Sequence, residues 1–377
     1  MRIGINALFL VPGGVGGTEI YLTSLLHALE LVDQSNEYLI FINCETAVGP
    51  SIAPSRFRLI ACAVRARSRP QRILWEQLFF PAQLARHRVD VLLNPGFTMP
   101  ILFQRPSVTV FHDLQHRRHP EFFRWFDLPF WNLLLWSSAK RSRSLIAVSD
   151  ATARDIGRYY SDVAHKTVVI PHGVDPEFFR VGERRAGRSI SPVEKYLLTV
   201  STLHPHKNIG RLLEAFHIFR ALHPEYRLIV AGLRGHATAA VEQLRRSLNL
   251  DDSVTLTGWI ARDALYNLFE HADAFVAPSS FEGFGMPLIE ALAAGIPTAC
   301  SGISPLTDIA GDAATQFDPA SAIAIADAME LIATDAAFRA QAVAAGPARA
   351  RQFDWATTAQ LTLWEIERAA RQTSQDG

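Results

Sequence analysis

Residues 274–295 read AFVAPSSFEGFGMPLIEALAAG and join a short apolar run to an apolar helical pattern through a glycine-containing loop. The first four residues carry no charge, which is typical of a strand buried on both faces of a parallel sheet. Gly283 and Gly285 allow the backbone to curl after this strand. Pro287 suits the first position of a helix, and Gly295 suits the position just beyond its end. The stretch therefore predicts a strand, a tight loop and a helix, the repeating unit of an α/β fold.

The same alternation of short apolar runs and helical patterns extends along the chain, with Gln71 to Arg88 and Phe122 to Ser142 among the predicted helices. Residues 176–194, PEFFRVGERRAGRSISPVE, interrupt it with Pro, Gly, Ser and clustered charge, and predict a linker. We therefore expect an α/β protein with two Rossmann-like domains that face each other across a cleft and bind ligands at the carboxyl ends of their strands. The predicted boundaries are 1–175 for the N-terminal domain, 176–194 for the linker, 195–350 for the C-terminal domain, and 351–377 for a helix that packs back on the N-terminal domain.

The overall composition excludes several classes of protein. The 377 residues include 37 Lys and Arg and 37 Asp and Glu, so the formal net charge is zero and we expect no nucleic-acid partner. Only three cysteines occur, far apart, which excludes a disulfide framework or a four-thiolate zinc site and suits a reducing compartment. No stretch approaches about 18 uncharged apolar residues, so we expect no transmembrane helix and a cytoplasmic location.

Two loops in the N-terminal half carry residues suited to ligand contact. Gly16 and Gly17 precede a predicted helix, whose N-terminal N–H groups favour an anion such as phosphate. Their spacing does not match the dinucleotide or Walker motifs, so a flexible turn is the alternative. His112 follows the strand 108–111, where its imidazole could donate to a ligand oxygen or shuttle a proton. Asp113 could orient His112 or cap the next segment, and a purely structural pair stays open.

A loop in the C-terminal half, STLHPHKN at 201–208, combines a lysine with two histidines. Lys207 stands just before a predicted helix and could neutralise phosphate charge as a compact cation. His204 and His206 lack a third ligand at a suitable spacing, so they are a weak signal for a metal site, and we expect none.

Glu282 and Glu290 flank the predicted helix start in the stretch quoted first. The helix start presents main-chain N–H donors that favour an anion. A carboxylate beside such donors suits a ligand that also carries hydroxyl groups, because carboxylates accept hydrogen bonds from diols. Phosphate together with sugar hydroxyls describes a nucleotide-sugar. The structural alternative is that both acids only interact with the helix dipole, which fits Glu282 better than Glu290.

The spacing of Glu282 and Glu290 within FEGFGMPLIEALAAG resembles the signature of the retaining GT-B glycosyltransferases of family 4. The resemblance covers nearly the whole chain in the expected order. Its other segments are the Gly16-Gly17-Thr18 loop, HDLQHRRHPEFF from 112, AVSDATARDI from 147, IPHGVD from 170 and STLHPHKNIGRLLEAF from 201.

The resemblance implies a role for each matching residue. His112 and Glu282 would contact the donor sugar as the catalytic residues, Lys207 the diphosphate, and Glu290 the ribose hydroxyls. The donor-binding residues implied are Gly16, Gly17, Thr202, Lys207, Gly283, Phe284, Gly285, Met286 and Glu290. Trp259 lies where the family's base-contacting loop would be. Three positions depart from the family pattern: Ser201 stands where Gly is frequent, His206 where Arg is frequent, and His172 where Asn is frequent. The loss of Arg at 206 puts the second phosphate contact in doubt, because His is mostly neutral at pH 7.

The family resemblance also implies the reaction. We expect a retaining hexosyltransferase that needs no metal or cofactor, since no Asp-x-Asp pair is present, with front-face attack assisted by the leaving phosphate. GDP-mannose is favoured over a UDP-hexose as donor, and a glycan or lipid-linked glycan as acceptor, in polysaccharide assembly.

Six arginines between 56 and 72, followed by aromatic segments at 73–81 and 121–136, predict peripheral contact with the inner face of the cytoplasmic membrane. Solvated loops and core-facing helices are the alternative.

Two other functions fit the same two-domain architecture. A nucleotide-sugar epimerase would convert its substrate without an acceptor. A catalytically silent protein would bind a nucleotide-sugar without turnover. A glycosidase is disfavoured, because Glu282 and Glu290 lie on one loop and helix rather than across a glycosidic bond.

Overall fold

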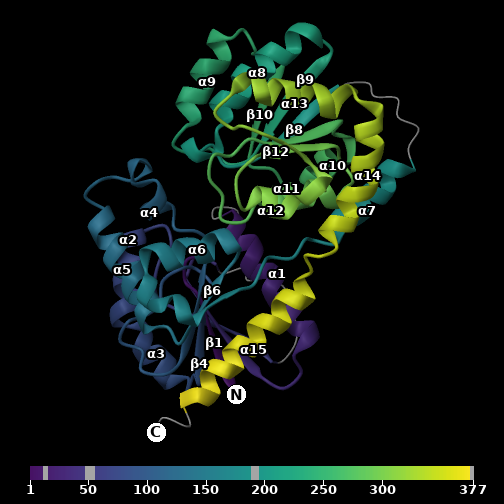
Figure 1. The fold of residues 1–377 in the computed structure, drawn as a ribbon. Coiled ribbons are helices and arrows are strands. Elements are labelled where there is room, and N and C mark those ends of the chain that lie inside the picture. The colour runs from purple at the N-terminus through teal and green to yellow at the C-terminus, as the bar shows by residue number, and fades with distance from the viewer. Residues whose placement is uncertain (12–15, 47–55, 188–194, 374–377) are drawn as a thin grey trace. The chain divides into compact units, whose positions relative to one another are not determined.

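A computed structural model describes residues 1–11, 16–46, 56–187 and 195–373. The chain forms two compact units, shown in Figure 1. Unit 1 comprises Met1–Gly173 together with Trp355–Gly377, and unit 2 comprises Val174–Asp354. Unit 2 is therefore one continuous segment inserted into unit 1.

The described part of unit 1 contains a seven-stranded parallel sheet in the order β3-β2-β1-β4-β5-β6-β7. Its strands are β1 (Arg2–Ala7), β2 (Glu37–Ile42), β3 (Phe57–Ala61), β4 (Val91–Asn94), β5 (Ser107–Phe111), β6 (Ser144–Ala147) and β7 (Thr167–Val169). Its helices are α1 (Gly17–Val32), α2 (Arg69–Leu78), α3 (Phe80–Arg86), α4 (Gln115–Arg118), α5 (Leu128–Arg141), α6 (Asp150–Tyr159) and α15 (Trp355–Thr373), with short 3₁₀ turns η1 (Pro120–Phe122) and η2 (Ser161–Lys166).

Unit 2, in its described residues, contains a six-stranded parallel sheet in the order β10-β9-β8-β11-β12-β13. Its strands are β8 (Lys195–Val200), β9 (Tyr226–Ala231), β10 (Val254–Gly258), β11 (Ala274–Ala277), β12 (Thr298–Ser301) and β13 (Thr315–Phe317). Its helices are α7 (Glu177–Ala186), α8 (Ile209–Leu222), α9 (Thr238–Ser247), α10 (Arg262–His271), α11 (Met286–Ala293), α12 (Leu306–Ala310), α13 (Ala322–Thr334) and α14 (Ala336–Ala350), with 3₁₀ turns η3 (Pro205–Lys207) and η4 (Gly311–Ala313).

Both sheets follow the strand order of the Rossmann fold, which confirms the predicted α/β class. The strand order reverses beside β1 in unit 1 and beside β8 in unit 2. Central strands such as β4, β5 and β6 are buried along their whole length, as their uninterrupted apolar runs predict. Because loops on either side of a reversal point diverge, the carboxyl end of the sheet there is the usual ligand site.

The predicted linker at 176–194 is wrong over its first part, because residues 177–186 form helix α7 of unit 2. Phe178 and Val181 are fully buried, and the Phe178 ring packs against Phe269 of α10 at 4.9 Å between centroids. The charges that suggest a loop lie on the outer side of α7, where Glu177 pairs with Arg180 and Arg184. The remaining positions, 188–194, lie outside the described residues.

The C-terminal helix α15 is part of unit 1, although unit 2 separates it from the rest of that unit in sequence. Figure 1 shows α15 running alongside α1, and the two helices pack together. Ile366 is fully buried, and the buried Glu365 carboxylate accepts a 2.6 Å hydrogen bond from the Ser144 hydroxyl of β6. Among the helices of the described residues, none combines the length and apolarity needed to cross a membrane.

Candidate functional site

The candidate site residues of unit 2 lie on two loops that flank the reversal point of its sheet. One loop follows β8 and contains Lys207, and the other follows β11 and contains Glu282. The two loops are joined directly, because the Ser280 amide donates to the His206 carbonyl at 2.8 Å. Asn208, held in the left-handed conformation at φ 57°, donates to the carbonyls of Pro278 at 3.0 Å and Pro319 at 2.8 Å. These bonds fix the two loops against each other.

Lys207 and Glu282 form an ion pair at 2.7 Å between Nζ and Oε1. The Ser279 hydroxyl donates to the same oxygen at 2.8 Å, so both loops hold this carboxylate in place. Both charged side chains are mostly buried. The pair brings together a cation suited to phosphate and a carboxylate suited to sugar hydroxyls, as expected from the two motifs.

Helix α11 begins directly after this pair. Gly285 precedes it at φ 111°, a conformation that favours glycine, and a Cβ there would lie 2.6 Å from Leu306 Cδ2. Pro287 has no N–H, and the Leu288 N–H donates to the Gly285 carbonyl at 3.0 Å, so the Met286 N–H and the helix dipole are what favour a negative charge at this helix end. A small cavity is lined by Ser201, Ser279, Glu282 and Pro287. The Ser201 hydroxyl is buried and, within the described residues, has no hydrogen-bond partner.

Glu290 lies one turn into α11 and is buried. Its Oε1 pairs with Arg262 Nη2 of α10 at 3.2 Å, and the same guanidinium nitrogen donates to Asp175 at 3.0 Å. Tyr266 also donates to Asp175. Burial raises the pKa of the Glu290 carboxyl to about 7, and the Arg262 charge opposes this rise. Glu290 therefore belongs to a buried charged network.

Arg262, Tyr266 and Asp175 are partners that the sequence analysis missed. Asp175 is the last residue of the IPHGVD segment that resembles the family. The sequence therefore singled out this segment, but it did not predict that Asp175 would pair with Arg262. Arg262 precedes Glu290 by 28 residues, with the rest of α10 and strand β11 between them, and no local pattern joins them. Only the packing of α10 and of α11 against α7 within unit 2 brings these charges together.

His112 follows β5 in unit 1, and its Nε2 lies 2.8 Å from the Pro95 carbonyl oxygen. A carbonyl can only accept, so Nε2 carries the proton and Nδ1 is an acceptor. The ring is packed by Tyr21 at 4.9 Å and by His172 at 5.5 Å between centroids. Burial lowers the pKa of the imidazole to about 4, so His112 is neutral near pH 7. The Asp113 carboxylate accepts from the Gln115 amide at 2.9 Å, at the first residue of α4.

Gly16 and Gly17 mark the start of α1 in unit 1, and residues 12–15 of their loop lie outside the described residues. Gly16 has φ 68°, and a Cβ at either glycine would meet no atom within 4 Å, so both leave open space beside the helix start. Tyr21, one turn into α1, contacts the His112 ring. The predicted residues thus form one group in unit 1, around Gly16, Gly17 and His112, and another in unit 2, around Lys207, Glu282 and Glu290.

The remaining predicted residues of unit 2 lie on the same two loops. Thr202 follows β8, and its carbonyl accepts from the His204 amide at 2.7 Å. Phe284 is buried and packs edge-on against Phe353, while Gly283 and Met286 flank the start of α11. Over the described residues, no three His, Cys, Asp or Glu side chains gather as a metal site would require.

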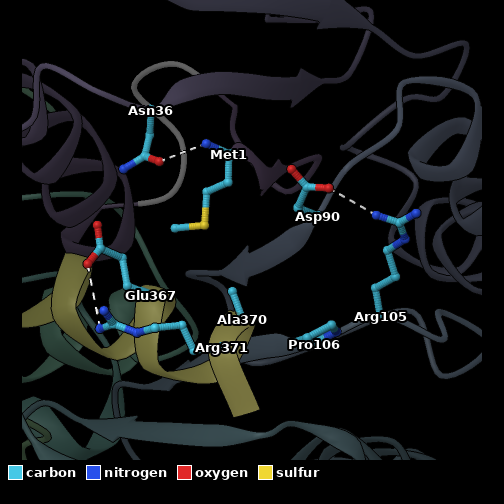
Figure 2. Close-up of a pocket in the computed structure, with 8 residues that line it drawn as sticks. All are labelled: Met1, Asn36, Asp90, Arg105, Pro106, Glu367, Ala370 and Arg371. Atoms are coloured by element: carbon cyan, nitrogen blue, oxygen red, sulfur yellow. Dashed lines mark hydrogen bonds and ion pairs between the residues drawn. The ribbon is translucent and has the colours of Figure 1, made fainter. Parts of the chain in front are cut away.

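A larger cavity of about 630 Å³ lies elsewhere in unit 1 and is shown in Figure 2. It is lined by Met1, Asn36, Asp90, Arg105, Pro106, Glu367, Ala370 and Arg371. Its polar groups pair with one another: the Met1 amine donates to Asn36 at 3.1 Å, and Arg105 pairs with Asp90 at 3.0 Å. Met1, Asp90 and Pro106 immediately precede β1, β4 and β5, so this cavity is at the amino ends of the strands, opposite the edge where such sheets bind ligands.

Comparison with known proteins identifies the family of this chain. The model described as "Glycosyltransferase Family 4" matches residues 15–178, and the model described as "Glycosyl transferases group 1" matches residues 183–349. O-antigen chain mannosyltransferase B of Escherichia coli is 27% identical over 373 residues, which cover 96% of this chain and 94% of that protein.

Solved structures show the same fold. Sucrose-phosphate synthase from Thermosynechococcus elongatus superposes with a TM-score of 0.80 at 21% identity, and the match covers both chains completely. Anabaena HepE in complex with UDP and glucose superposes with a TM-score of 0.74 at 18% identity, over 97% of this chain and 99% of that one. With two family models covering most of its length and a Rossmann-like parallel sheet in each unit, as in GT-B enzymes, the chain belongs to the group 1, family 4 glycosyltransferases.

Proposed function

We propose that this glycosyltransferase moves a hexose, with mannose favoured, from a nucleotide-sugar to a glycan or lipid-linked glycan during polysaccharide assembly. The observation that carries the proposal is the Lys207–Glu282 pair beside the start of α11. A lone phosphate site would not need a carboxylate that repels the anion. A diphosphate bonded to a sugar needs both a cation and an acceptor for hydroxyl groups.

In the proposed complex, Lys207 and the Met286 N–H at the start of α11 bind the donor diphosphate. They also stabilise the negative charge that develops on the leaving nucleotide, so no metal is required. The phosphate competes with Glu282 for Lys207, since the two side chains pair when no ligand is bound. Glu282 then accepts hydrogen bonds from the hydroxyls of the transferred sugar. The Ser201 hydroxyl, buried and without a hydrogen-bond partner in the described residues, is a further candidate donor to phosphate.

Glu290 accepts from the ribose hydroxyls in this proposal. Its pairing with Arg262 supports the ionised form, while burial alone favours the protonated form. A bound diol adds two donors and strengthens the ionised form further. Asp175 and Tyr266 hold Arg262 in place, so they are positioning residues for Glu290.

His112 contributes a neutral imidazole on the unit that carries the acceptor-side loops. Because its Nε2–H is engaged by Pro95, its Nδ1 can only accept, for example from a hydroxyl of the donor sugar. A proton shuttle at His112 would need that ring to leave Pro95. We therefore propose that His112 orients the sugar, and that the leaving phosphate assists front-face attack with retention of configuration.

One relative favours GDP-mannose as the donor, whereas one structural neighbour favours UDP-glucose. The relative named as an O-antigen chain mannosyltransferase, similar along almost its whole length, supports mannose and hence a GDP-linked donor. The neighbour HepE was solved with UDP and glucose, which keeps UDP-glucose as the competing donor.

The test is sugar transfer by the purified full chain. The chain is incubated with GDP-mannose, UDP-glucose or UDP-galactose and with lipid-linked glycan extracted from a strain that lacks the enzyme, with and without EDTA. We expect transfer from GDP-mannose, unaffected by EDTA, with an α-anomeric product by NMR that matches the donor. Transfer from a UDP-sugar alone would contradict mannose, an inverted product would contradict retention, and donor conversion without transfer would identify an epimerase.

A further inference from the structure

The exposed apolar side chains of unit 1 concentrate on α5 and on the turn before it. Trp125 is 81% exposed and Leu133 is 62% exposed. The exposed large apolar residues of this region are Trp125, Phe126, Phe130, Leu133 and Trp136. On α5 itself they recur every three residues, so they share one side of the helix. The opposite side of α5 is already buried through Leu134, Leu135, Ser138 and Ala139, so the outer side is not needed for the core.

Helix α2 extends the same surface. Leu74, Leu78 and Phe79 are exposed there, at a spacing that places them on one side. The Arg69 guanidinium of α2 lies 3.9 Å from the centroid of the Trp131 ring of α5, so the two helices are neighbours, as Figure 1 also shows. Gln77 binds the Met99 carbonyl at 3.0 Å and the Ile101 amide at 2.9 Å, which holds the exposed Leu102 beside α2.

We call this surface the aromatic face and define it by its nine exposed apolar residues, namely Leu74, Leu78, Phe79, Leu102, Trp125, Phe126, Phe130, Leu133 and Trp136. Soluble proteins normally place polar side chains on the outer side of such helices. Exposed tryptophan, phenylalanine and leucine on two adjacent helices therefore indicate that another molecule or surface covers the aromatic face.

Cations flank the aromatic face in sequence. Exposed basic side chains precede α2, precede Trp125 and end α5, and these are Arg65, Arg67, Arg124, Lys140 and Arg141. Two of them have acidic partners, since Arg67 pairs with Glu45 at 3.9 Å and Lys140 pairs with Asp162. Glu121 and Asp127 are the acids within the segment from 120 to 141. The other three, Arg65, Arg124 and Arg141, exceed these two acids by one charge, so the borders of the aromatic face carry a small local surplus of positive charge in a chain that is neutral overall.

We propose that the aromatic face docks on the surface of a lipid bilayer that contains anionic lipids. Tryptophan and phenylalanine rings suit the boundary between headgroups and acyl chains, and arginine or lysine beside them suits lipid phosphates. A second copy of the chain is a poorer occupant, because a two-fold interface brings identical cationic borders together. The proposal needs no sugar donor, so it stands or falls independently of the proposed transfer reaction.

Vesicle flotation of the full chain tests the proposal. The probes are vesicles of phosphatidylcholine alone and of phosphatidylcholine mixed with phosphatidylglycerol, each at low and high salt. We expect flotation with the anionic vesicles that is reduced by salt, and little with phosphatidylcholine alone. Binding should blue-shift the tryptophan emission, because Trp125 and Trp136 leave water. No flotation with anionic vesicles, or equal flotation with both kinds, would overturn the proposal.

Matched variants distinguish vesicle binding through the aromatic face from non-specific adsorption of the protein. Trp125→Ser and Leu133→Ser should each weaken binding severalfold, whereas the control variants Trp364→Ser on α15 and Leu31→Ser on α1 should not, although those side chains are 54% and 78% exposed. Arg124→Glu with Arg141→Glu should lower partitioning by at least about tenfold, since each surface cation contributes about 1 kcal/mol to binding of an anionic membrane. Arg246→Glu on α9 is the charge control.

Sedimentation in the absence of lipid examines the alternative occupant. A monomer at all concentrations is the expected result. A dimer that Trp125→Ser dissociates would show that a second copy covers the face, and would overturn the lipid proposal. All four apolar substitutions are at exposed positions, so unchanged melting temperatures should accompany them.

Discussion

At the scale of single residues, the Lys207–Glu282 ion pair shows how the two charges of the proposed donor site are balanced before a donor binds. Each charge lies within a mostly buried loop, and each neutralises the other while no donor is bound. Removing one partner leaves the other charge buried without compensation, which is why the effects of the two substitutions will not add. The same reasoning applies to Glu290 and Arg262, which share the charge of Asp175.

Glu282→Ala is expected to lower kcat/KM for sugar transfer by about 100-fold or more, because it removes hydrogen bonds to the transferred sugar. The measurement is initial rate against donor concentration. Glu282→Gln should retain part of the activity, since its amide oxygen still accepts from a hydroxyl group.

Glu214→Ala on α8 is the control for this prediction, because Glu214 is a partly exposed acid of the same unit whose carboxylate pairs with Arg211 of the same helix. Transfer by that variant should be normal. Near-normal turnover of Glu282→Ala, with its fold intact, would remove Glu282 from the site.

Buried histidines make the stability of unit 1 depend on pH. Burial lowers the pKa of His112 and of His116 to about 4. The unfolded chain binds protons on these side chains near pH 6.5, whereas the folded chain does not, so protonation favours unfolding. The stabilising contribution is complete above about pH 6.5 and is lost progressively as the pH falls toward 4. Urea denaturation at pH 7.5, 6.0 and 5.0 should show a steadily smaller free energy of unfolding.

His116→Gln should flatten part of this pH dependence. His116 is buried and its Nε2 lies 3.1 Å from the Tyr160 hydroxyl, outside the proposed catalytic contacts. His27→Gln, at an exposed position of α1, should leave the slope as it is. An unchanged slope in His116→Gln would show that other groups set the acid sensitivity.

At the scale of elements, helix α15 is a structural part of unit 1 although it is the last helix of the chain. It packs on α1, and Thr358 Oγ1 donates to the Pro171 carbonyl at 2.8 Å, just before the chain leaves the unit. Trp355 lies at the first turn and contacts both Tyr21 and His172. The start of α15 thus supports the packing of the rings around His112.

Ile366→Ala should lower the free energy of unfolding by roughly 2–4 kcal/mol, because it leaves a cavity at a fully buried position between α15 and its neighbours. Equilibrium denaturation in urea gives the value. Leu361→Ala, on the partly exposed side of the same helix, should cost less than about 1 kcal/mol. Equal effects at both positions would show that α15 does not pack as described.

Prolines shift two helix boundaries from those that the apolar pattern predicts. The pattern over Gln71 to Arg88 predicts one helix, but the chain forms α2 and α3 with Phe79 between them and Pro81 in the first turn of α3. Similarly, α5 begins at Leu128 with Pro129 in its first turn, not at Phe122. Proline lacks an N–H and is best tolerated in a helix's first turn, so Pro81 and Pro129 favour a helix that begins just before them, although α14 accommodates Pro347 in its interior.

At the scale of the whole molecule, the chain crosses between its two units twice, near Gly173 and near Trp355. Unit 2 is continuous in sequence, and it has its own apolar core around Phe216, Leu228 and Met329. Unit 1 is built from both ends of the chain and cannot be completed until the last helix has been made.

A fragment of residues 174–354 is therefore expected to fold on its own. It should melt cooperatively in circular dichroism, since it contains the complete six-stranded sheet and its covering helices. Thermal shift with GDP and UDP then examines nucleotide preference without the acceptor-side unit. A non-cooperative melt would contradict this division, and a cooperative fragment that ignores both nucleotides would count against the proposed donor site alone. A fragment of residues 1–173, which lacks α15, should be unstable or aggregate.

The sequence by itself determined the fold class, because uncharged apolar runs between amphipathic patterns can only be strands covered on both faces. It also predicted Lys207, Glu282 and His112 as candidate site residues, since glycine, proline and charge at strand ends leave a local pattern, and their roles stay predictions. The linker prediction was wrong over residues 177–186, because α7 buries only Phe178 and Val181. Its arginines give this segment the composition of a solvent-exposed loop. The packing of the C-terminal helix on the N-terminal unit was also expected from the sequence, and α15 does belong to unit 1. Tertiary structure alone decided that Arg262 meets Glu290 and that Pro95 fixes the His112 tautomer. These contacts join residues that are distant in sequence, and the free energy that favours them comes from packing whole elements, which no local pattern records.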